Sequence, residues 1–357
     1  MTILQNGNII AQTGVWLDLH DIKDFYERAV ITDNTSGVIS NWSSTVQTVQ
    51  YQTAAISDED TNLIVFVHGI NVDDWHWLDA SETVYKRLYW AGYHGKFATV
   101  KWPCELLNTW TFLMQDYTVF NDSEISAYKA GAALKTYVDQ LHTRFSGYRL
   151  HLLVHSQGNS VVSEAIRQGA EFDTYILTQG ALPASCYDAN APLNNFLVSY
   201  ESTWGPTPEW QPLGYHGVYT NFSGQFTGQI VNFYNTNDPV LDDWVTAQGF
   251  AKPNTPNTDY HYNGTIGTYE PPFGSIYTVT DPQESRACVS RSRTLPIGQS
   301  GPETAHGVIQ SGVDLHVRFG FNKAFPDDHS AQWTWPIQTT RPYFQQVLTS
   351  CQIIPAP

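Results

Sequence analysis

Positive charge is scarce in this chain of 357 residues. Lys and Arg number 18 against 34 Asp and Glu, which gives a formal net charge of −16 at pH 7. Such a chain repels phosphate backbones and anionic lipid surfaces, so we expect neither a nucleic-acid partner nor a role at a membrane surface. The excess of acid decides nothing about the fold, which depends on the pattern of apolar residues.

Long hydrophobic runs, a signal peptide and paired cysteines are also missing. No stretch approaches the roughly 18–20 apolar residues that span a bilayer, and residues 1–7 show neither the basic nor the apolar region of a signal peptide. The chain is nevertheless acidic, poor in Lys and rich in Trp and Tyr. We therefore expect an exported protein, secreted or periplasmic, whose leader lies outside this sequence. No zinc ribbon or assignable disulfide is indicated by the four unpaired cysteines, Cys104, Cys186, Cys288 and Cys351.

The motifs of metal and nucleotide sites are absent as well. The sequence has no H-E-x-x-H, no set of His and Cys with ligand spacing, and no G-x-G-x-x-G or Walker sequence. We therefore expect no metal and no cofactor. The chain does contain 41% hydrophobic and 14% aromatic residues. This content excludes intrinsic disorder, and the length suits one large domain or two modest ones.

Short apolar runs alternate with helical periodicity along much of the chain. Alternation at Val49, Tyr51 and Thr53 predicts an antiparallel edge strand near the N-terminus. Strands that are apolar on both faces and alternate with helices are typical of an α/β fold, with a mostly parallel central sheet flanked by helices. Such strands are predicted at 63–67, 97–102, 150–154, 175–177 and 230–234, with helices at 81–91, 122–146 and 160–167.

One serine stands at the junction of a predicted strand and a predicted helix. Residues 152–160 read Leu-Leu-Val-His-Ser-Gln-Gly-Asn-Ser, with Ser156 two positions before Gly158. This segment resembles the nucleophile elbow, G-x-S-x-G, of the α/β-hydrolase superfamily, a strained turn that lifts the serine hydroxyl clear of the sheet. The side chains two positions before and after the serine must be small. Gly158 fits this rule and Val154 departs from it, and a serine that only caps the helix is the alternative interpretation.

The resemblance extends to the end of an earlier buried strand. His68-Gly69-Ile70 directly follows the strand at 63–67, where the superfamily forms half of its oxyanion hole. The resemblance implies that the backbone amides of Ile70 and Gln157 hold the oxyanion. A simple turn at the end of the strand is the alternative interpretation.

The acid of a serine triad is implied at Asp238. The segment Asn-Thr-Asn-Asp-Pro-Val at 235–240 follows the strand at 230–234. There the superfamily usually keeps the carboxylate that holds the tautomer of the catalytic histidine. Asp188, after the preceding strand, is an alternative, and Asp242 and Asp243 are weaker candidates. The simplest other role for Asp238 is an Asx-turn before proline.

The base of the triad must follow the acid in the chain order Ser, Asp, His. Three histidines qualify after the loop-like segment at 244–305, namely His306, His316 and His329. Alternation over 313–319 predicts an edge strand with His316 on its solvated face. The segment Asp-His-Ser-Ala-Gln at 328–332 resembles the loop in which the superfamily places its base. The resemblance therefore implies His329, with His306 as the alternative.

Two further histidines are predicted to be structural. His155 adjoins Ser156, but consecutive side chains of a strand point to opposite faces, so it cannot face the serine hydroxyl as a base. We expect it to serve in packing. His68 is expected to orient the turn that follows the strand at 63–67.

The resemblance covers roughly residues 60–185 and 229–350, and the remaining segments are predicted from their composition and position. Residues 1–60 are predicted to be an N-terminal extension that packs on the core, and residues 61–357 to be the catalytic domain. Two insertions interrupt this domain: a cap at 185–228, rich in Trp, Tyr, Phe, Pro and Gly, and a loop-like segment at 244–305.

The expected function is that of a serine hydrolase. Ser156, Asp238 and His329 are expected to cleave a carboxylic ester through an acyl-enzyme. The aromatic cap favours an apolar, small-molecule or lipid-like ester, as in esterases and lipases. The alternatives are a thioesterase, amidase or acyltransferase with the same triad, or a non-catalytic binding module on a hydrolase fold. No oligomeric state can be assigned.

Overall fold

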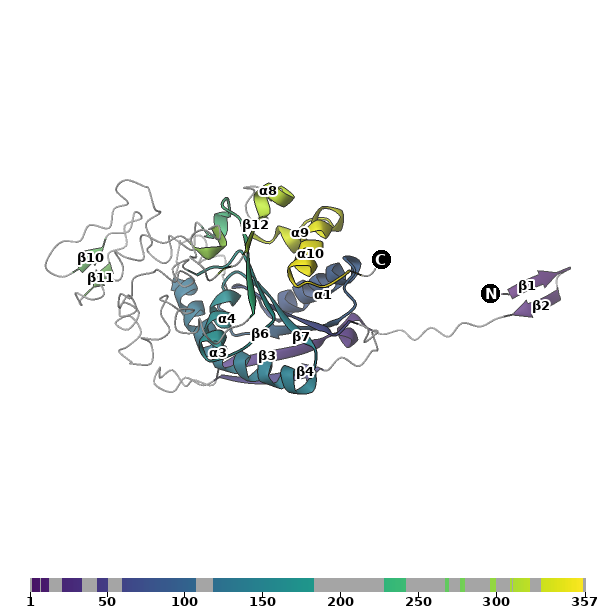
Figure 1. Ribbon diagram of the computed structural model, residues 1–357, viewed down its shortest axis with the longest axis horizontal. Helices are drawn as coiled ribbons and strands as arrows, with labels where there is room; N and C mark the ends of the chain where they lie inside the picture. The colour runs from purple at the N-terminus through teal and green to yellow at the C-terminus, as the bar shows by residue number, and fades with distance from the viewer. Residues whose placement is uncertain are drawn as a thin grey trace.

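The centre of the molecule is an eight-stranded sheet with the strand order β12-β9-β8-β7-β5-β6-β3-β4 (Figure 1). Every neighbouring pair is parallel except β3 and β4. The strands are β3 (Glu27–Asp33), β4 (Ser44–Gln50), β5 (Asn62–Val67), β6 (Lys96–Lys101), β7 (Arg149–His155), β8 (Thr174–Thr178), β9 (Gln229–Tyr234) and β12 (Ser311–Asp314). The computed structural model describes residues 2–6, 8–12, 21–33, 44–50, 60–106, 118–182, 228–241, 267–269, 277–279, 296–299, 309, 311–321 and 329–355.

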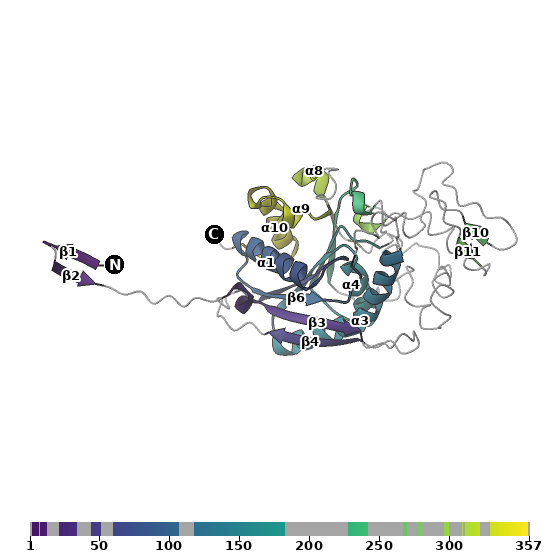
Figure 2. The ribbon, with the colours of Figure 1, turned by 180° about the vertical axis from the view of Figure 1, so that it is seen from behind.

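Helices cover both faces of this sheet. α3 and α4 pack on one face, and α1 and α10 on the other, as the two opposite views show (Figures 1 and 2). The helices are α1 (Asp74–Trp90), α3 (Thr118–Arg144), α4 (Gly158–Arg167), α8 (Leu315–Phe319), α9 (Ala331–Thr334) and α10 (Ile337–Ser350). Short 3-10 helices occur at η1 (Ile22–Phe25) and η5 (Ile297–Gln299). Two small separate sheets are formed by β1 (Thr2–Gln5) with β2 (Asn8–Gln12), and by β10 (Gly267–Tyr269) with β11 (Tyr277–Val279).

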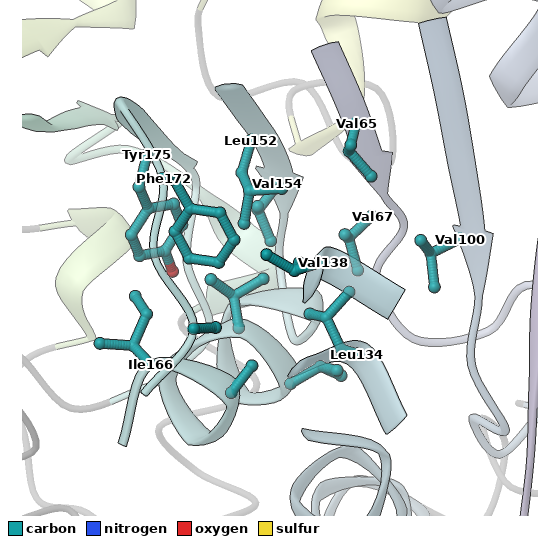
Figure 3. Close-up of a cluster of buried hydrophobic side chains, with 14 of the residues drawn as sticks. Val65, Val67, Val100, Leu134, Val138, Leu152, Val154, Ile166, Phe172 and Tyr175 are labelled. Atoms are coloured by element: carbon teal, nitrogen blue, oxygen red, sulfur yellow. The ribbon is translucent and has the colours of Figure 1, made fainter. Parts of the chain in front are cut away.

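The central strands are apolar on both faces because each face is covered by helices. On β7, Leu152 and Val154 point into the core on the α3 and α4 side (Figure 3), whereas Leu153 belongs to the core beneath α1 and α10. Side chains that alternate between two buried layers explain why the sequence shows continuous apolar runs here. The predicted fold class, a mostly parallel sheet between helix layers, is confirmed.

The first 60 residues contribute two strands to this sheet. β3 pairs in parallel with β6, and β4 closes the edge as the antiparallel partner of β3. The alternation around Val49 thus marks a true edge strand, although Tyr51 and Thr53 lie outside the described residues. β3 was not predicted, because Arg28, Thr32 and Asp33 interrupt its apolar pattern.

α1 begins at Asp74, about two turns before the predicted start at residue 81. Asp73 caps it, since its carboxylate accepts a hydrogen bond of 2.8 Å from the backbone amide of His76. The helix ends as predicted at Ala91 and Gly92, where Gly92 takes a φ of 103°. Asp73 is a typical cap residue and could have been recognised in the sequence. It starts the helix although the first turns contain Trp and His, which are weaker helix formers.

The edge strand predicted over 313–319 is wrong in its second half. β12 ends at Asp314, and residues 315–319 form α8. The carboxylate of Asp314 accepts a hydrogen bond from the amide of Val317, and Gly320, with a φ of 74°, ends the helix. These two caps override the alternating pattern of apolar and polar residues. A helix of only five residues shows too little helical periodicity to be recognised in the sequence. His316 therefore lies on α8 and not on a strand.

The cap predicted at 185–228 lies almost wholly outside the described residues. Of the insertion at 244–305, the structure describes only β10, β11 and the segment 296–299. Within the described part of the chain, no helix combines the length and the apolar character needed to cross a bilayer.

Candidate active site

Three loops converge at the carboxyl ends of neighbouring strands. Ser156 follows β7, Gln179 follows β8, and Asp238 lies four residues beyond β9. Backbone hydrogen bonds tie the first two of these loops to the next strand: the Ser156 amide donates to Thr178 O at 3.0 Å, and the Gln179 amide to Phe233 O at 2.9 Å. Because β7, β8 and β9 are parallel neighbours, all three side chains arise at the same edge of the sheet.

Backbone strain is concentrated at this edge. Asn71, Ser156 and Gln179 have φ values of 61°, 51° and 46°, and they account for three of the five non-glycine residues with positive φ in the described part of the chain. Each such conformation costs on the order of 1–3 kcal/mol and persists only where the surroundings enforce it. The positive φ of Ser156 is the strained turn that an elbow requires.

The turn after Ser156 passes close to the end of β5. A Cβ atom on Gly158 would lie 2.3 Å from His68 O, and one on Gly69 would lie 2.7 Å from the Cβ of Ser156. Only glycine fits at either position, because both contacts are shorter than real Cβ atoms tolerate. The serine side chain therefore stands directly against the backbone of the β5 loop.

Val154, the residue that departs from the elbow pattern, is fully buried in the core on the α3 and α4 side (Figure 3). It faces Val67 of β5 and Leu177 of β8 in the sheet register. The close backbone contact of this turn is at Gly158, beside His68 O, whereas the side chain of Val154 packs among apolar neighbours. The departure therefore leaves the geometry of the turn intact.

Asp238 is completely buried and holds two sets of donors. Its Oδ1 accepts hydrogen bonds from the amides of Val240 at 3.0 Å and Leu241 at 3.2 Å. Its Oδ2 accepts from Gln179 Nε2 at 2.7 Å and from His329 Nδ1 at 2.6 Å. The Asx-turn that was the alternative role for Asp238 is thus present, but it uses one oxygen and leaves the other for the histidine.

His329 is the histidine that the fold brings to Asp238, 91 residues away in the chain. The carboxylate accepts the Nδ1 hydrogen, so Nε2 is the unprotonated nitrogen of the ring. Nε2 is buried and has no hydrogen-bond partner among the described residues. The alternative His306 lies outside the described residues, and His316, on α8, bonds to the carbonyl of Phe321 just beyond that helix.

Gln179 is a site residue that the sequence did not reveal. It is fully buried, and its amide donates to the same carboxylate oxygen of Asp238 as His329 does. Gly298 packs directly on the backbone of residues 179 and 180, where a Cβ atom would lie 2.3 Å from the carbonyl carbon of Gln179. Nothing in a single glutamine after a strand signals this contact. Asp188, Asp242 and Asp243, the other acids considered, lie outside the described residues.

The β5 loop is held by the segment that follows β6. The buried ring of Trp102 donates from Nε1 to His68 O at 2.8 Å, and its backbone amide donates to His68 Nε2 at 3.2 Å. Further along, the Asn71 amide donates to Glu105 O at 3.2 Å. Both flanks of Ile70 are therefore anchored to residues 102–105.

His68 has the structural role that was predicted for it. Its Nδ1 donates to Gly69 O at 2.7 Å while Nε2 accepts from the amide of Trp102. Burial lowers the pKa of His68 to about 3, so the ring stays neutral and keeps this pattern of one donor and one acceptor.

Two backbone amides near Ser156 belong to segments that suit an oxyanion. Ile70 follows Gly69, which contacts the Ser156 side chain, and Gln157 is the residue that precedes α4. The positive end of a helix dipole favours an anion at such a terminus. No group of three or more His, Cys, Asp or Glu side chains with the geometry of a metal site occurs among the described residues.

Arg87 holds the segment that carries His329. Its buried guanidinium donates to Gln332 O at 2.7 Å, Trp333 O at 2.7 Å, Trp335 O at 2.8 Å and the hydroxyl of Thr340 at 2.6 Å. Three of these acceptors are carbonyls in or just after α9, so the cation from α1 ties down the helix that begins two residues after His329. The sequence offers no signal for this contact across about 250 residues.

The chain matches a protein-family model over residues 44–178, described as "Alpha/beta hydrolase of unknown function (DUF900)". The matched part runs from β4 to β8 and includes Ser156, whereas Asp238 and His329 lie beyond it. A search of curated proteins finds no match.

Proposed function

We propose that this chain, which has an α/β-hydrolase fold and matches an α/β-hydrolase family model over residues 44–178, is a serine hydrolase that cleaves carboxylic esters. The observation that carries the proposal is the state of His329. Its Nδ1 is bound to the buried carboxylate of Asp238, and its Nε2 has no partner among the described residues. A histidine held in this tautomer is arranged to accept a proton at Nε2. The strained turn that bears Ser156 directly follows His155, whose ring contacts His329.

In the proposed reaction, Ser156 Oγ attacks the carbonyl carbon of the ester while its proton passes to His329 Nε2. The negative oxygen that forms is held by the amides of Ile70 and Gln157, each worth about 3–4 kcal/mol of barrier. Collapse of this intermediate expels the alcohol, which takes the proton back from His329. Water, activated by the same nitrogen, then attacks the acyl-enzyme and releases the carboxylic acid.

Asp238 supports both steps without moving a proton itself. It keeps the Nδ1 hydrogen in place and stabilises the imidazolium that forms when Nε2 is protonated. Gln179 and two backbone amides hold the carboxylate in turn, so the acid cannot rotate away from the ring.

A fluorophosphonate probe tests the proposal directly, because it reacts with a serine only where a base activates the hydroxyl. We expect stoichiometric labelling of the wild-type chain and none of Ser156→Ala. Ser160→Ala is the matched control: Ser160 is buried on α4 and its hydroxyl has no partner among the described residues. Its variant should label like wild type. An unlabelled wild-type chain would contradict the proposal and favour a non-catalytic binding module.

The preference for apolar esters rests on the aromatic composition of residues 185–228. We expect p-nitrophenyl esters of medium acyl chains to be hydrolysed with a kcat/KM at least 10-fold above that of acetate, since each buried CH₂ contributes about 0.8 kcal/mol. Initial rates across chain lengths measure this. Labelled protein that hydrolyses none of these esters, but transfers acyl groups to an amine or thiol, would instead indicate an acyltransferase.

A further inference from the structure

His155 contacts the segments that carry all three parts of the proposed machinery. It is the last residue of β7 and directly precedes Ser156. Its Nε2 lies 2.7 Å from the backbone carbonyl oxygen of His329. A Cβ atom on Gly69, in the β5 loop, would lie 3.1 Å from His155 Nδ1.

The ring of His155 is enclosed by aromatic neighbours. Its centroid lies 4.6 Å from that of His329, and it meets Trp333 edge to face at 4.5 Å. The side chain points to the same face of β7 as Leu153 and away from the α3 and α4 layer that Val154 enters. His155 is therefore wedged between the sheet and the segment that bears His329.

The carbonyl of His329 needs a side-chain donor, because it takes no part in the backbone hydrogen bonds of α9. The first carbonyl of α9 to accept a backbone amide is that of Ser330, which binds Trp333 and Thr334. His329 O precedes it and receives His155 Nε2 at 2.7 Å, with Gln332 Nε2 at a longer 3.4 Å. A buried carbonyl without a donor is costly, and the bond from His155 is the shorter of these two, so it restrains the position of the His329 backbone.

We propose that His155 is a positioning residue for catalysis: by donating its Nε2 hydrogen to the backbone carbonyl of His329, it sets the distance between the base and the Ser156 turn. The inference rests on the proposed function and adds a residue to it. His155 itself transfers no proton to the substrate, because its donor nitrogen is engaged by the carbonyl of His329.

The ionisation of the site agrees with this role. Burial, and then the neighbouring His329 and His68, hold the pKa of His155 well below its ordinary value of 6.5. The ring is therefore neutral at working pH, and since a carbonyl can only accept, the single hydrogen must sit on Nε2. A neutral ring adds no positive charge beside His329, where a cation would oppose protonation of the base.

The test compares three replacements of His155 with one of His151. Phenylalanine keeps the ring shape but removes the donor. Glutamine places an amide nitrogen about as far along the side chain as Nε2, whereas asparagine places it only as far as Nδ1. His151→Phe is the matched control: this buried histidine lies on the same face of β7 and bonds to Asn62 Oδ1 at 2.9 Å, at the opposite end of the strand.

We expect His155→Phe to lower kcat and the rate of fluorophosphonate labelling by about 10- to 100-fold with little change in KM, because misplacement of a catalytic group by ~1 Å costs up to 10²-fold. His155→Gln should retain kcat within about 3-fold and His155→Asn should resemble phenylalanine, since only glutamine reaches the carbonyl. His151→Phe should lower the melting temperature comparably and leave kcat unchanged. If the phenylalanine variant does not fold, the kcat values of His155→Gln and His155→Asn test the positioning role by themselves.

Equal kcat and labelling rates for wild type, His155→Gln and His155→Asn would overturn the inference, as would equal losses of kcat in His155→Phe and His151→Phe. In both cases a labelled wild-type chain leaves the serine hydrolase proposal standing. A wild-type chain that is not labelled overturns the proposed function itself, and the positioning role with it.

Discussion

Alanine at Ser156 should lower kcat by on the order of 10⁶-fold, and alanine at His329 by about the same factor, as in serine triads where the two residues act as a unit. Without the hydroxyl no acyl-enzyme forms, and without the ring nothing takes the proton from the hydroxyl. The structure gives the reason for expecting one unit, since the turn that bears Ser156 and the loop that bears His329 are joined through His155. The double variant should therefore be no slower than either single one.

Steady-state rates on a p-nitrophenyl ester measure this, with active sites counted by the burst of product. His316→Ala is the control for the histidine, because His316 lies on α8 and bonds to Phe321 O, outside the site. Losses that multiply in the double variant would mean that Ser156 and His329 act independently. A His329→Ala variant with wild-type kcat would show that another residue, such as His306, is the base.

Asparagine at Asp238 should lower kcat by about 10⁴-fold with a small effect on KM, the loss seen when a triad acid is replaced by its amide. The carboxylate accepts four hydrogen bonds: Oδ1 accepts from two backbone amides, and Oδ2 accepts from Gln179 and His329. An amide NH₂ has no orientation that satisfies them, because it faces donors on either side. With NH₂ towards His329, the ring turns to the tautomer with its hydrogen on Nε2 and can no longer accept a proton.

Asp173→Asn makes the same chemical change at a carboxylate outside the site. Asp173 precedes β8 and accepts a hydrogen bond of 2.8 Å from the amide of Leu150, at the amino end of the strands and far from the site in the sheet. We expect this variant to lose some stability and to keep its kcat. Thermal melting beside the kinetics separates the two effects, and an Asp238→Asn variant that is folded and fully active would remove Asp238 from the mechanism.

Local patterns in the sequence were enough for the core of the fold. The apolar runs at 63–67 and 150–154 are strands with both faces buried, and Gly158 marks the turn in which a Cβ atom would strike His68 O. Each of these signals comes from residues that are neighbours in the chain, so it depends only on the local backbone conformation. The prediction failed where local signals compete: over 313–319 the strand gives way at Asp314 to a short helix, which Asp314 caps at its start and Gly320 ends.

The sequence by itself determined the types of most central elements, the position of the elbow serine, and the alternation of strands and helices along the chain. Only the tertiary structure decided that β3 enters the sheet beside β6, that Asp238 faces His329, and that Gln179 and His155 hold them. The physical reason is that periodicity and turn chemistry act over a few residues. Contacts between groups 59 to 174 positions apart depend on how the finished layers pack, and no neighbouring residues encode them.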